Sequence, residues 1–141
     1  MRTFLLSIIA VLTALGFSTN AFAKSNAQFG FMNWNTAEFE EAVANGDRVI
    51  VSVWATWCPS CRAQRKTLSA LLDGGDYGDV KVFGVEFDDP NAPQMIGSHS
   101  ILPGDPYATK TTLIFFNGGE QVDVYQGQSD MMMAAILSVD I

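Results

Sequence analysis

The apolar positions of the chain concentrate in residues 49–55, where valine, isoleucine, tryptophan and alanine form an almost unbroken run. Such a run, rich in β-branched residues, is typical of a strand buried on both faces of a sheet. Residues 62–72 then favour a helix and carry Leu68, Leu71 and Leu72 at helical core spacing. The pattern therefore predicts a buried strand that leads directly into an amphipathic helix.

Turn and cap signals divide the rest of the chain. Asn35 precedes a helical pattern and has Glu38 three residues further on, which is the register of a capping box. Asn-Gly-Gly at residues 117–119 separates two strand-like runs and indicates a hairpin. Residues 24–30 are small and polar and predict a frayed end. The other predicted elements are helices at 36–44, from 88–91 to Ile96 and from Ser129, strands at 31–34, 80–87, 111–116 and 120–125, and a long loop at 97–109.

The two cysteines of the chain, Cys58 and Cys61, lie at the junction of the central strand and its helix. A sulfur at a helix N-terminus lies near unpaired backbone N–H groups and the positive end of the helix dipole, which favours its thiolate form. Pro59 suits the first helical position, where its missing N–H costs no hydrogen bond. We therefore expect Cys58 to be the nucleophile and Cys61, one turn further in, to resolve a mixed disulfide.

Residues 54–61, Trp-Ala-Thr-Trp-Cys-Pro-Ser-Cys, resemble the active-site segment of the thioredoxin superfamily, and residues 112–120 are similar to its C-terminal hairpin. The resemblance implies an α/β fold of thioredoxin type, with a central mixed β-sheet flanked by α-helices on both faces. It also implies thiol–disulfide exchange through Cys58 and Cys61, a redox-active pair, with protein partners. The surroundings of this pair are then Trp54, Trp57, Pro59, Ser60, Lys110 and Thr111.

Two positions depart from the superfamily pattern. Ser52 stands where many members carry a buried acid that helps proton transfer to the inner cysteine, so a water or another carboxylate, such as Glu86, is needed for this role. Thr111 stands where a cis-proline usually faces the cysteines. A cis bond before threonine costs about 3–4 kcal/mol, against roughly 0.5–1 kcal/mol before proline. We therefore predict a trans Lys110–Thr111 bond, with the threonine hydroxyl and the lysine charge favouring an ionised Cys58.

Three cations, Arg62, Arg65 and Lys66, follow the cysteines on the predicted helix. Cations near the sulfurs favour a thiolate, but ordinary surface charge is the simpler interpretation of Arg65 and Lys66. His99, the one histidine, is interpreted as a plain loop residue. Within the loop at residues 97–109 we expect apolar side chains to form a lip that contacts protein partners; these are Ile101, Leu102 and Tyr107.

Other uses of the cysteine pair are possible. A bridge that closes a four-residue loop stabilises a fold by only about 2 kcal/mol, so stability alone is a poor reason for it. Zinc needs four ligands, and two cysteines with His99 supply three, so we expect no metal and no other cofactor. A redox-inactive binding module and an iron–sulfur cluster shared between two chains remain alternatives. Three adjacent methionines, Met131 to Met133, point in different helical directions and predict packing rather than a copper site.

Residues 1–23 have the pattern of a secretory signal peptide: Arg2, an apolar stretch, and Ala-Phe-Ala at the end. We expect cleavage after Ala23 and one thioredoxin-like domain at residues 24–141, in the periplasm or secreted, without a stable membrane span. An uncleaved N-terminal anchor is the alternative. Export suits the cysteine pair, because disulfides persist outside the cytosol.

The formal net charge of the chain is −7. This charge argues against nucleic acid or an anionic membrane as a partner. The expected partners are protein thiols and disulfides and a redox partner protein, and the expected state is a monomer. Pro59 and Ser60 between the cysteines carry no charge and no imidazole, so a moderate or reducing potential is favoured over that of an extreme oxidant.

Overall fold

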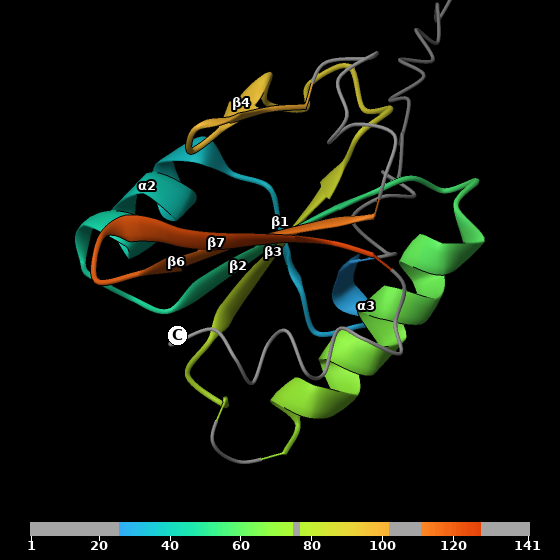
Figure 1. Cartoon of the computed structure of the whole chain (residues 1–141), viewed down its shortest axis with the longest axis horizontal. Coiled ribbons are helices and arrows are strands. Elements are labelled where there is room, and N and C mark those ends of the chain that lie inside the picture. Colours follow the sequence, from blue (N-terminus) through green and yellow to red (C-terminus); the bar gives the residue numbers. More distant parts are fainter. Residues whose placement is uncertain (1–25, 75–76, 102–110, 128–141) are drawn as a thin grey trace, which may run out of the picture.

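The computed structural model of the protein describes residues 26–74, 77–101 and 111–127. A five-stranded sheet with the order β1-β3-β2-β6-β7 crosses the middle of the molecule (Figure 1). β1, β3 and β2 are parallel to each other, and β6 and β7 run antiparallel to their neighbours. The strands are β1 (Met32–Asn33), β2 (Val49–Trp54), β3 (Lys81–Glu86), β6 (Thr112–Asn117) and β7 (Glu120–Gln126).

Side chains of β2 alternate between two hydrophobic clusters, one on each face of the sheet. Val49, Val51 and Val53 belong to the cluster that contains Phe39 of helix α2 (Thr36–Ala44). Ile50 belongs to the other cluster, with Leu68 of helix α3 (Pro59–Leu72). Figure 1 shows α2 and α3 on opposite sides of the sheet. The expected α/β fold with a mixed sheet and helices on both faces is thus confirmed.

The predicted signals at the helix starts are confirmed as well. The side-chain oxygen of Asn35 accepts hydrogen bonds from the backbone N–H groups of Ala37 and Glu38, at 3.0 and 3.2 Å. Its amide also reaches the Glu38 carboxylate at 3.3 Å. At the other helix, Pro59 occupies the first turn directly after Cys58. Both helices therefore begin where local sequence signals satisfy or remove the unpaired backbone donors.

The prediction of a frayed segment at residues 24–30 is wrong for the part that the structure describes. Asn26 is buried, and its amide donates to the Gly84 carbonyl oxygen at 3.0 Å and to the Asn33 side chain at 3.1 Å. A Cβ atom on Gly84 would lie 2.1 Å from Asn26 Oδ1, so only glycine leaves space for this contact. The small polar residues therefore anchor the segment against β3 instead of fraying from it.

The predicted short helix that ends near Ile96 is also wrong. Residues 88–94 form turns, after which β4 (Met95–Ile96) and β5 (His99–Ser100) pair as a small antiparallel hairpin. Pro93 lies inside the segment and removes a helical hydrogen-bond donor. Gly97 turns the chain with a φ of +57°. The first part of the predicted loop at residues 97–109 is therefore regular structure, and residues 102–110 lie outside the described residues.

Candidate active site

Cys58 and Cys61 are joined as a disulfide in the structure, with 5.3 Å between their Cα atoms. Cys58 is the N-cap of α3, and its sulfur accepts a hydrogen bond from the backbone N–H of Cys61 at 3.2 Å. Cys58 is partly exposed, whereas only 3% of Cys61 is exposed. The structure therefore places one sulfur at the surface, at the start of a helix, and the other beneath it.

Thr111, directly before β6, lies against both sulfurs. Its hydroxyl oxygen is 3.3 Å from the Cys61 sulfur, 3.7 Å from the Cys58 sulfur and 3.2 Å from the Ser60 hydroxyl. The side chain is buried, with 6% exposed. A hydroxyl at this distance can donate a hydrogen bond to either sulfur once that sulfur is a thiolate. Lys110 and the Lys110–Thr111 bond lie outside the described residues, so the trans bond stays a prediction.

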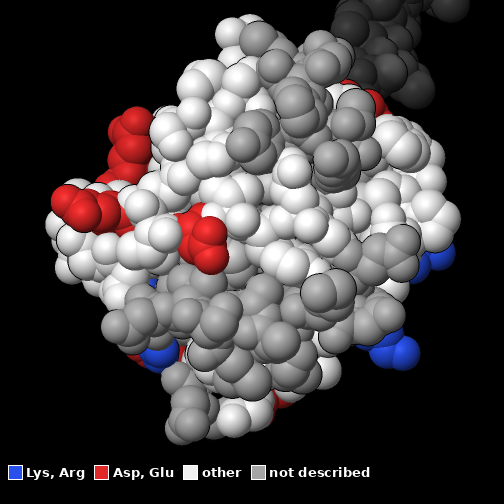
Figure 2. Space-filling model, viewed as in Figure 1, with Lys and Arg blue, Asp and Glu red and all other residues white. Residues whose placement is uncertain are grey.

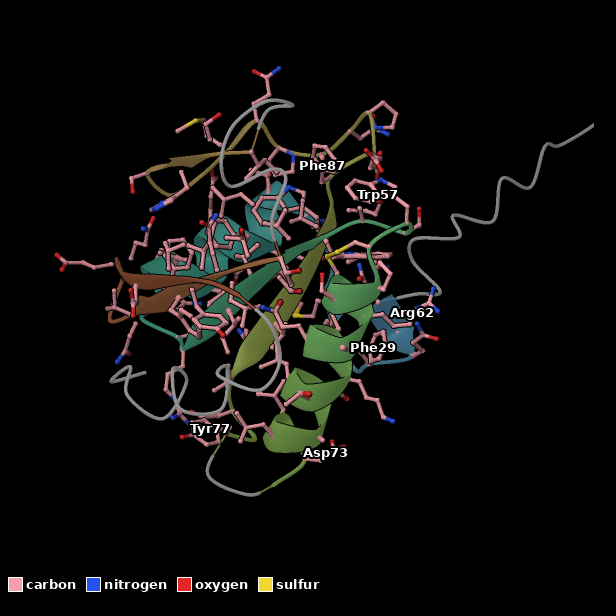
Figure 3. All side chains as sticks on the ribbon, turned by 45° about the vertical axis from the view of Figure 1, so that its right-hand side comes forward. Phe29, Trp57, Arg62, Asp73, Tyr77 and Phe87 are labelled. Carbon is pink, nitrogen blue, oxygen red and sulfur yellow. A yellow bond between two sulfur atoms is a disulfide. The ribbon has the colours of Figure 1, made fainter. Side chains whose placement is uncertain are left out.

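The two tryptophans of the motif have different environments. Trp57 is 63% exposed, and its indole N–H donates to the Asp88 carboxylate. Its ring also meets the Phe87 ring edge-on, with 6.3 Å between centroids (Figure 3). Trp54 is buried instead, at the end of β2. Trp57 is therefore held in place as an exposed apolar surface beside Cys58, whereas Trp54 lies under the active-site loop.

Arg65 is buried, with 1% exposed, so its interpretation as a surface charge is wrong. Its guanidinium lies 3.9 Å from the centroid of the Trp54 ring and 4.7 Å from that of Phe29, and it donates to the Asn26 side chain. Burial lowers the pKa of Arg65 to about 10, an effect that the Glu86 carboxylate partly opposes. Arg65 therefore carries a buried positive charge beneath the active-site loop.

Glu86 is buried at the end of β3, opposite Trp54 of β2. One carboxylate oxygen accepts the Thr56 N–H at 3.2 Å, and the other has no hydrogen-bond partner among the described residues. Burial raises the pKa of Glu86, the Thr56 hydrogen bond lowers it, and the nearby Asp88 charge raises it further. Ser52 is fully buried, and no partner of its hydroxyl lies in the described segments. A role of Glu86 in proton transfer stays a prediction.

Gln64 is a further buried polar residue of α3 that the sequence did not single out. Its amide donates to the Gly127 carbonyl oxygen at 3.3 Å, which ties the helix to the end of β7. Its side-chain oxygen has no hydrogen-bond partner in the part of the chain that the structure describes. The sequence held a signal for this burial: Gln64 and Arg65 follow Cys61 at the i+3 and i+4 positions, and Leu68 is at i+7.

Outside the site, His99 contacts Gln121 of β7 at 3.0 Å and the Ser98 hydroxyl at 3.1 Å through its Nδ1 atom. Ile101, part of the expected lip, is buried in the core, while Leu102 and Tyr107 lie outside the described residues. Ser129 and the methionines at 131–133 also lie outside them. No helix in the described ranges has the length and apolar composition needed to cross a membrane. Nor do these ranges bring together three side chains suited to a metal ion.

A mixed sheet between helices, with a Cys-x-x-Cys disulfide at the start of a helix, defines the thioredoxin-fold class of redox proteins. The family model for thioredoxin matches residues 30–138. The chain therefore belongs to the thioredoxin family, and the resemblance noted in the sequence is confirmed.

Named relatives agree with this family. Over 69 residues the chain is 39% identical to the thiol:disulfide interchange protein DsbE of Tatumella citrea. This aligned region covers 49% of the chain and 34% of DsbE. The chain thus spans about a third of this curated relative. The solved structure of Trxlp from Edwardsiella tarda matches with a TM-score of 0.57 and 29% identity, over 74% of this chain and 94% of Trxlp.

Mitochondrial thioredoxin 3 of Saccharomyces cerevisiae, solved in its oxidised form, matches with a TM-score of 0.55 and 16% identity. The match covers 77% of this chain and 94% of the yeast chain. At this identity the match is evidence for the fold alone. It shows that the sheet and helices of this chain have the arrangement found in a thioredoxin.

Proposed function

We propose that this protein is a thiol–disulfide oxidoreductase that exchanges disulfides with protein partners through Cys58 and Cys61. The observation that carries the proposal is the unequal exposure of two bonded sulfurs at the start of α3. A partner thiolate reaches the outer sulfur, and the inner sulfur is shielded from solvent. This asymmetry is what a nucleophile and a resolving cysteine require.

The exchange starts, in one direction, from the disulfide seen in the structure. A partner thiolate attacks the Cys58 sulfur, a mixed disulfide forms, and Cys61 leaves as a thiolate. The Thr111 hydroxyl, 3.3 Å from the Cys61 sulfur, is placed to stabilise that leaving thiolate. A second partner thiolate then attacks the partner sulfur of the mixed disulfide and releases Cys58 as a thiolate. Two electrons pass from the partner to the protein, and the partner becomes the disulfide.

In the reverse direction, the Cys58 thiolate attacks a partner disulfide and Cys61 releases the reduced partner. The helix start supports the Cys58 thiolate, because the Cys61 N–H already points at its sulfur at 3.2 Å. The name of the Tatumella citrea relative, a thiol:disulfide interchange protein, fits both directions. Which direction prevails depends on the reduction potential of the pair.

Trp57 belongs to the surface of this protein that contacts the partner. It is mostly exposed, and its contacts with Asp88 and Phe87 hold it in place. A rigid exposed aromatic ring gives contact area with little loss of conformational entropy. We place the protein outside the cytosol as a monomeric domain of residues 24–141, after removal of residues 1–23. Mass spectrometry of the native protein tests this location: Lys24 as the first residue supports export, and an intact Met1 contradicts cleavage.

The decisive experiment compares two cysteine variants in a turbidity assay of insulin disulfide reduction. Cys58→Ser is expected to abolish activity, because the attacking sulfur is gone. Cys61→Ala is expected to retain the attack and to accumulate mixed disulfides that a reductant releases. Full activity of Cys58→Ser contradicts the mechanism. Inactivity of the wild type in both oxidising and reducing assays favours a binding module, and a visible chromophore in a dimer favours an iron–sulfur carrier.

A further inference from the structure

We propose that a small cavity beside Cys58 is a subsite for a carboxylate group of the disulfide partner. The inference rests on the proposed function, since it assigns the chemistry of a partner that reacts at Cys58. The cavity has a volume of about 100 Å³ and is lined by Cys58, Trp54 and two arginines, Arg62 and Arg65, among others. A nucleophilic sulfur and two cations thus face one hollow.

Arg65 forms the inner, positive wall of this cavity. It is held between aromatic rings, 3.9 Å from the Trp54 centroid and 4.7 Å from the Phe29 centroid, so its position is fixed. Glu86 is the carboxylate whose charge acts on it. Because Glu86 accepts the Thr56 N–H, this carboxylate also bonds to the backbone of the active-site loop.

Arg62 supplies the second charge, from the outside. Its side chain is exposed, and it forms no ion pair with any residue in the described ranges. Figure 3 shows Arg62 and Phe29 on the same side of α3, although Phe29 comes from the N-terminal segment. An arginine at the rim of a hollow can close over a carboxylate with two parallel hydrogen bonds.

The indole N–H of Trp54 is an independent sign that a ligand belongs here. Trp54 lines the cavity, and only 6% of the residue is exposed. Its Nε1 atom has no hydrogen-bond partner among the described residues. A buried donor without an acceptor costs about 1–3 kcal/mol. A carboxylate brings two acceptor oxygens and can satisfy both this donor and an arginine.

The size of the cavity limits what enters it. A volume of about 100 Å³ exceeds the ~10–15 Å³ needed for one water. It suits one carboxylate group and the first atoms of the group that carries it, while the rest of the partner stays outside the cavity. Because Cys58 lines the same hollow, the carboxylate has to lie within a few residues of the partner cysteine. The expected partner is therefore an acidic cysteine-containing segment.

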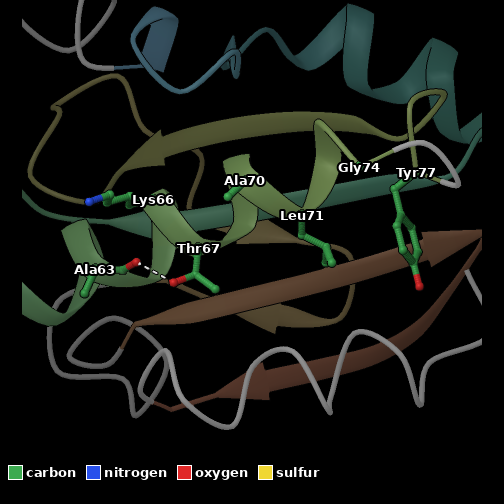
Figure 4. Close-up of a pocket in the computed structure, with 7 residues that line it drawn as sticks. All are labelled: Ala63, Lys66, Thr67, Ala70, Leu71, Gly74 and Tyr77. Carbon is green, nitrogen blue, oxygen red and sulfur yellow. Dashed lines mark hydrogen bonds between the residues drawn. The ribbon is translucent and has the colours of Figure 1, made fainter.

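A general attraction by positive charge on α3 is the competing explanation. Figure 2 shows cationic atoms at the edge of the molecule where Figure 1 places α3, while acidic atoms gather near α2. Lys66 separates the two explanations, because it is an exposed cation of the same helix. It lines a different groove of about 540 Å³ with Thr67 and Tyr77 (Figure 4), and it is not among the residues that line the cavity beside Cys58.

The test uses the full reduced protein and two small aromatic disulfides. One probe is the anionic dithiobis(nitrobenzoate), which carries carboxylates, and the other is the neutral dithiodipyridine. In each reaction the Cys58 thiolate attacks one probe sulfur and expels one aromatic thiolate, and Cys61 then expels the second. The protein is oxidised by two electrons and the probe is reduced. Stopped-flow absorbance of the first released thiolate gives the rate of attack.

Arg62→Gln is expected to slow the anionic probe about fivefold relative to the neutral probe, the size of one partly exposed ion pair. The neutral probe corrects for any change in the ionisation of Cys58. Lys66→Gln is the matched control and is expected to leave the ratio of the two rates unchanged. Equal losses in both variants indicate general attraction and overturn the subsite, as does an unchanged ratio in Arg62→Gln.

Trp54→Phe gives a second, independent arm. It keeps an aromatic ring under Arg65 and removes the indole N–H, so the anionic probe is again expected to slow relative to the neutral probe. A ratio equal to that of the wild type in this variant overturns the part assigned to Trp54. Failure of the wild type to react faster than a free thiol with the neutral probe contradicts the proposed function instead, which keeps the two failures distinct.

Discussion

The hydroxyl oxygen of Thr111 lies 3.3 Å from the sulfur of Cys61, a residue 50 positions earlier in the chain. The same oxygen contacts the Cys58 sulfur at 3.7 Å. A hydroxyl in this position can donate to a thiolate, whereas a proline ring cannot. The residue that takes the usual place of the cis-proline is therefore part of the environment of both sulfurs.

Thr111→Val is expected to raise the pKa of the reactive thiol by about one unit, because it removes the hydroxyl and keeps the shape. A destabilised thiolate also makes the disulfide harder to reduce, by up to ~30 mV. The pH dependence of alkylation and an equilibrium with glutathione measure the two effects. Thr112→Val is the control, since the Thr112 hydroxyl bonds to Gln126 instead. Unchanged values in Thr111→Val contradict the contact.

In the reduced protein, Cys58 is expected to alkylate at least tenfold faster than Cys61 near neutral pH, with a pKa below the free value of about 8.5. The reason is the helix start and the difference in exposure between the two sulfurs. Peptide mapping after a short pulse of iodoacetamide identifies the modified sulfur. Equal labelling of both cysteines would remove the argument for an activated nucleophile.

The stability of Glu86→Gln relative to the wild type is expected to increase as the pH rises from about 4.5 to neutral. Burial raises the pKa of Glu86 above the ordinary value of 4.5, so the folded state holds this proton more tightly than the unfolded state. The stability linked to the proton is present at acid pH and lost as the pH rises through the folded pKa. Glutamine keeps an oxygen for the Thr56 N–H and does not ionise.

Urea unfolding of the wild type and of Glu86→Gln at several pH values measures this trend. Glu40→Gln, an exposed residue of α2, controls for the loss of one negative charge. A difference in unfolding free energy between wild type and Glu86→Gln that is the same at every pH would show that burial does not shift this carboxyl group.

Gly84→Ala is expected to destabilise the fold by about 1–3 kcal/mol, because the added Cβ meets the Asn26 side chain at 2.1 Å. Asn26→Ala alone also destabilises it, through loss of the hydrogen bonds to Gly84 and Arg65. In the double variant the clash is gone, so Gly84→Ala is expected to lower the unfolding free energy much less in the Asn26→Ala background than in the wild type. Strict additivity in this double-mutant cycle would contradict the packing of the N-terminal segment on β3.

Local sequence signals were sufficient for the framework of the site. The apolar run of β2, the proline after Cys58 and the cap at Asn35 each act on neighbours within a few residues. Their effects depend little on the rest of the chain, so the central strand, the helix after it and the cysteine pair at their junction were all predictable. The alternation of β2 side chains also followed from the strand period alone.

Long-range closure of the fold decided the polar surroundings. The sequence pattern matches Thr111 to the cis-proline position of the superfamily. Its distance from each sulfur, however, depends on how the folded chain brings residue 111 to the start of α3. Arg65 has helical core spacing from Cys61, but the residues that cover it, Asn26 and Phe29, come from the N-terminal segment. No residue within a helical turn of Arg65 indicates which segment provides that cover. Residues 88–96 carry cap signals, yet they end in a hairpin whose Ile96 packs into the core. Helix propensities of residues other than proline differ by no more than about 1 kcal/mol, so contacts with distant segments can determine which side chains are buried.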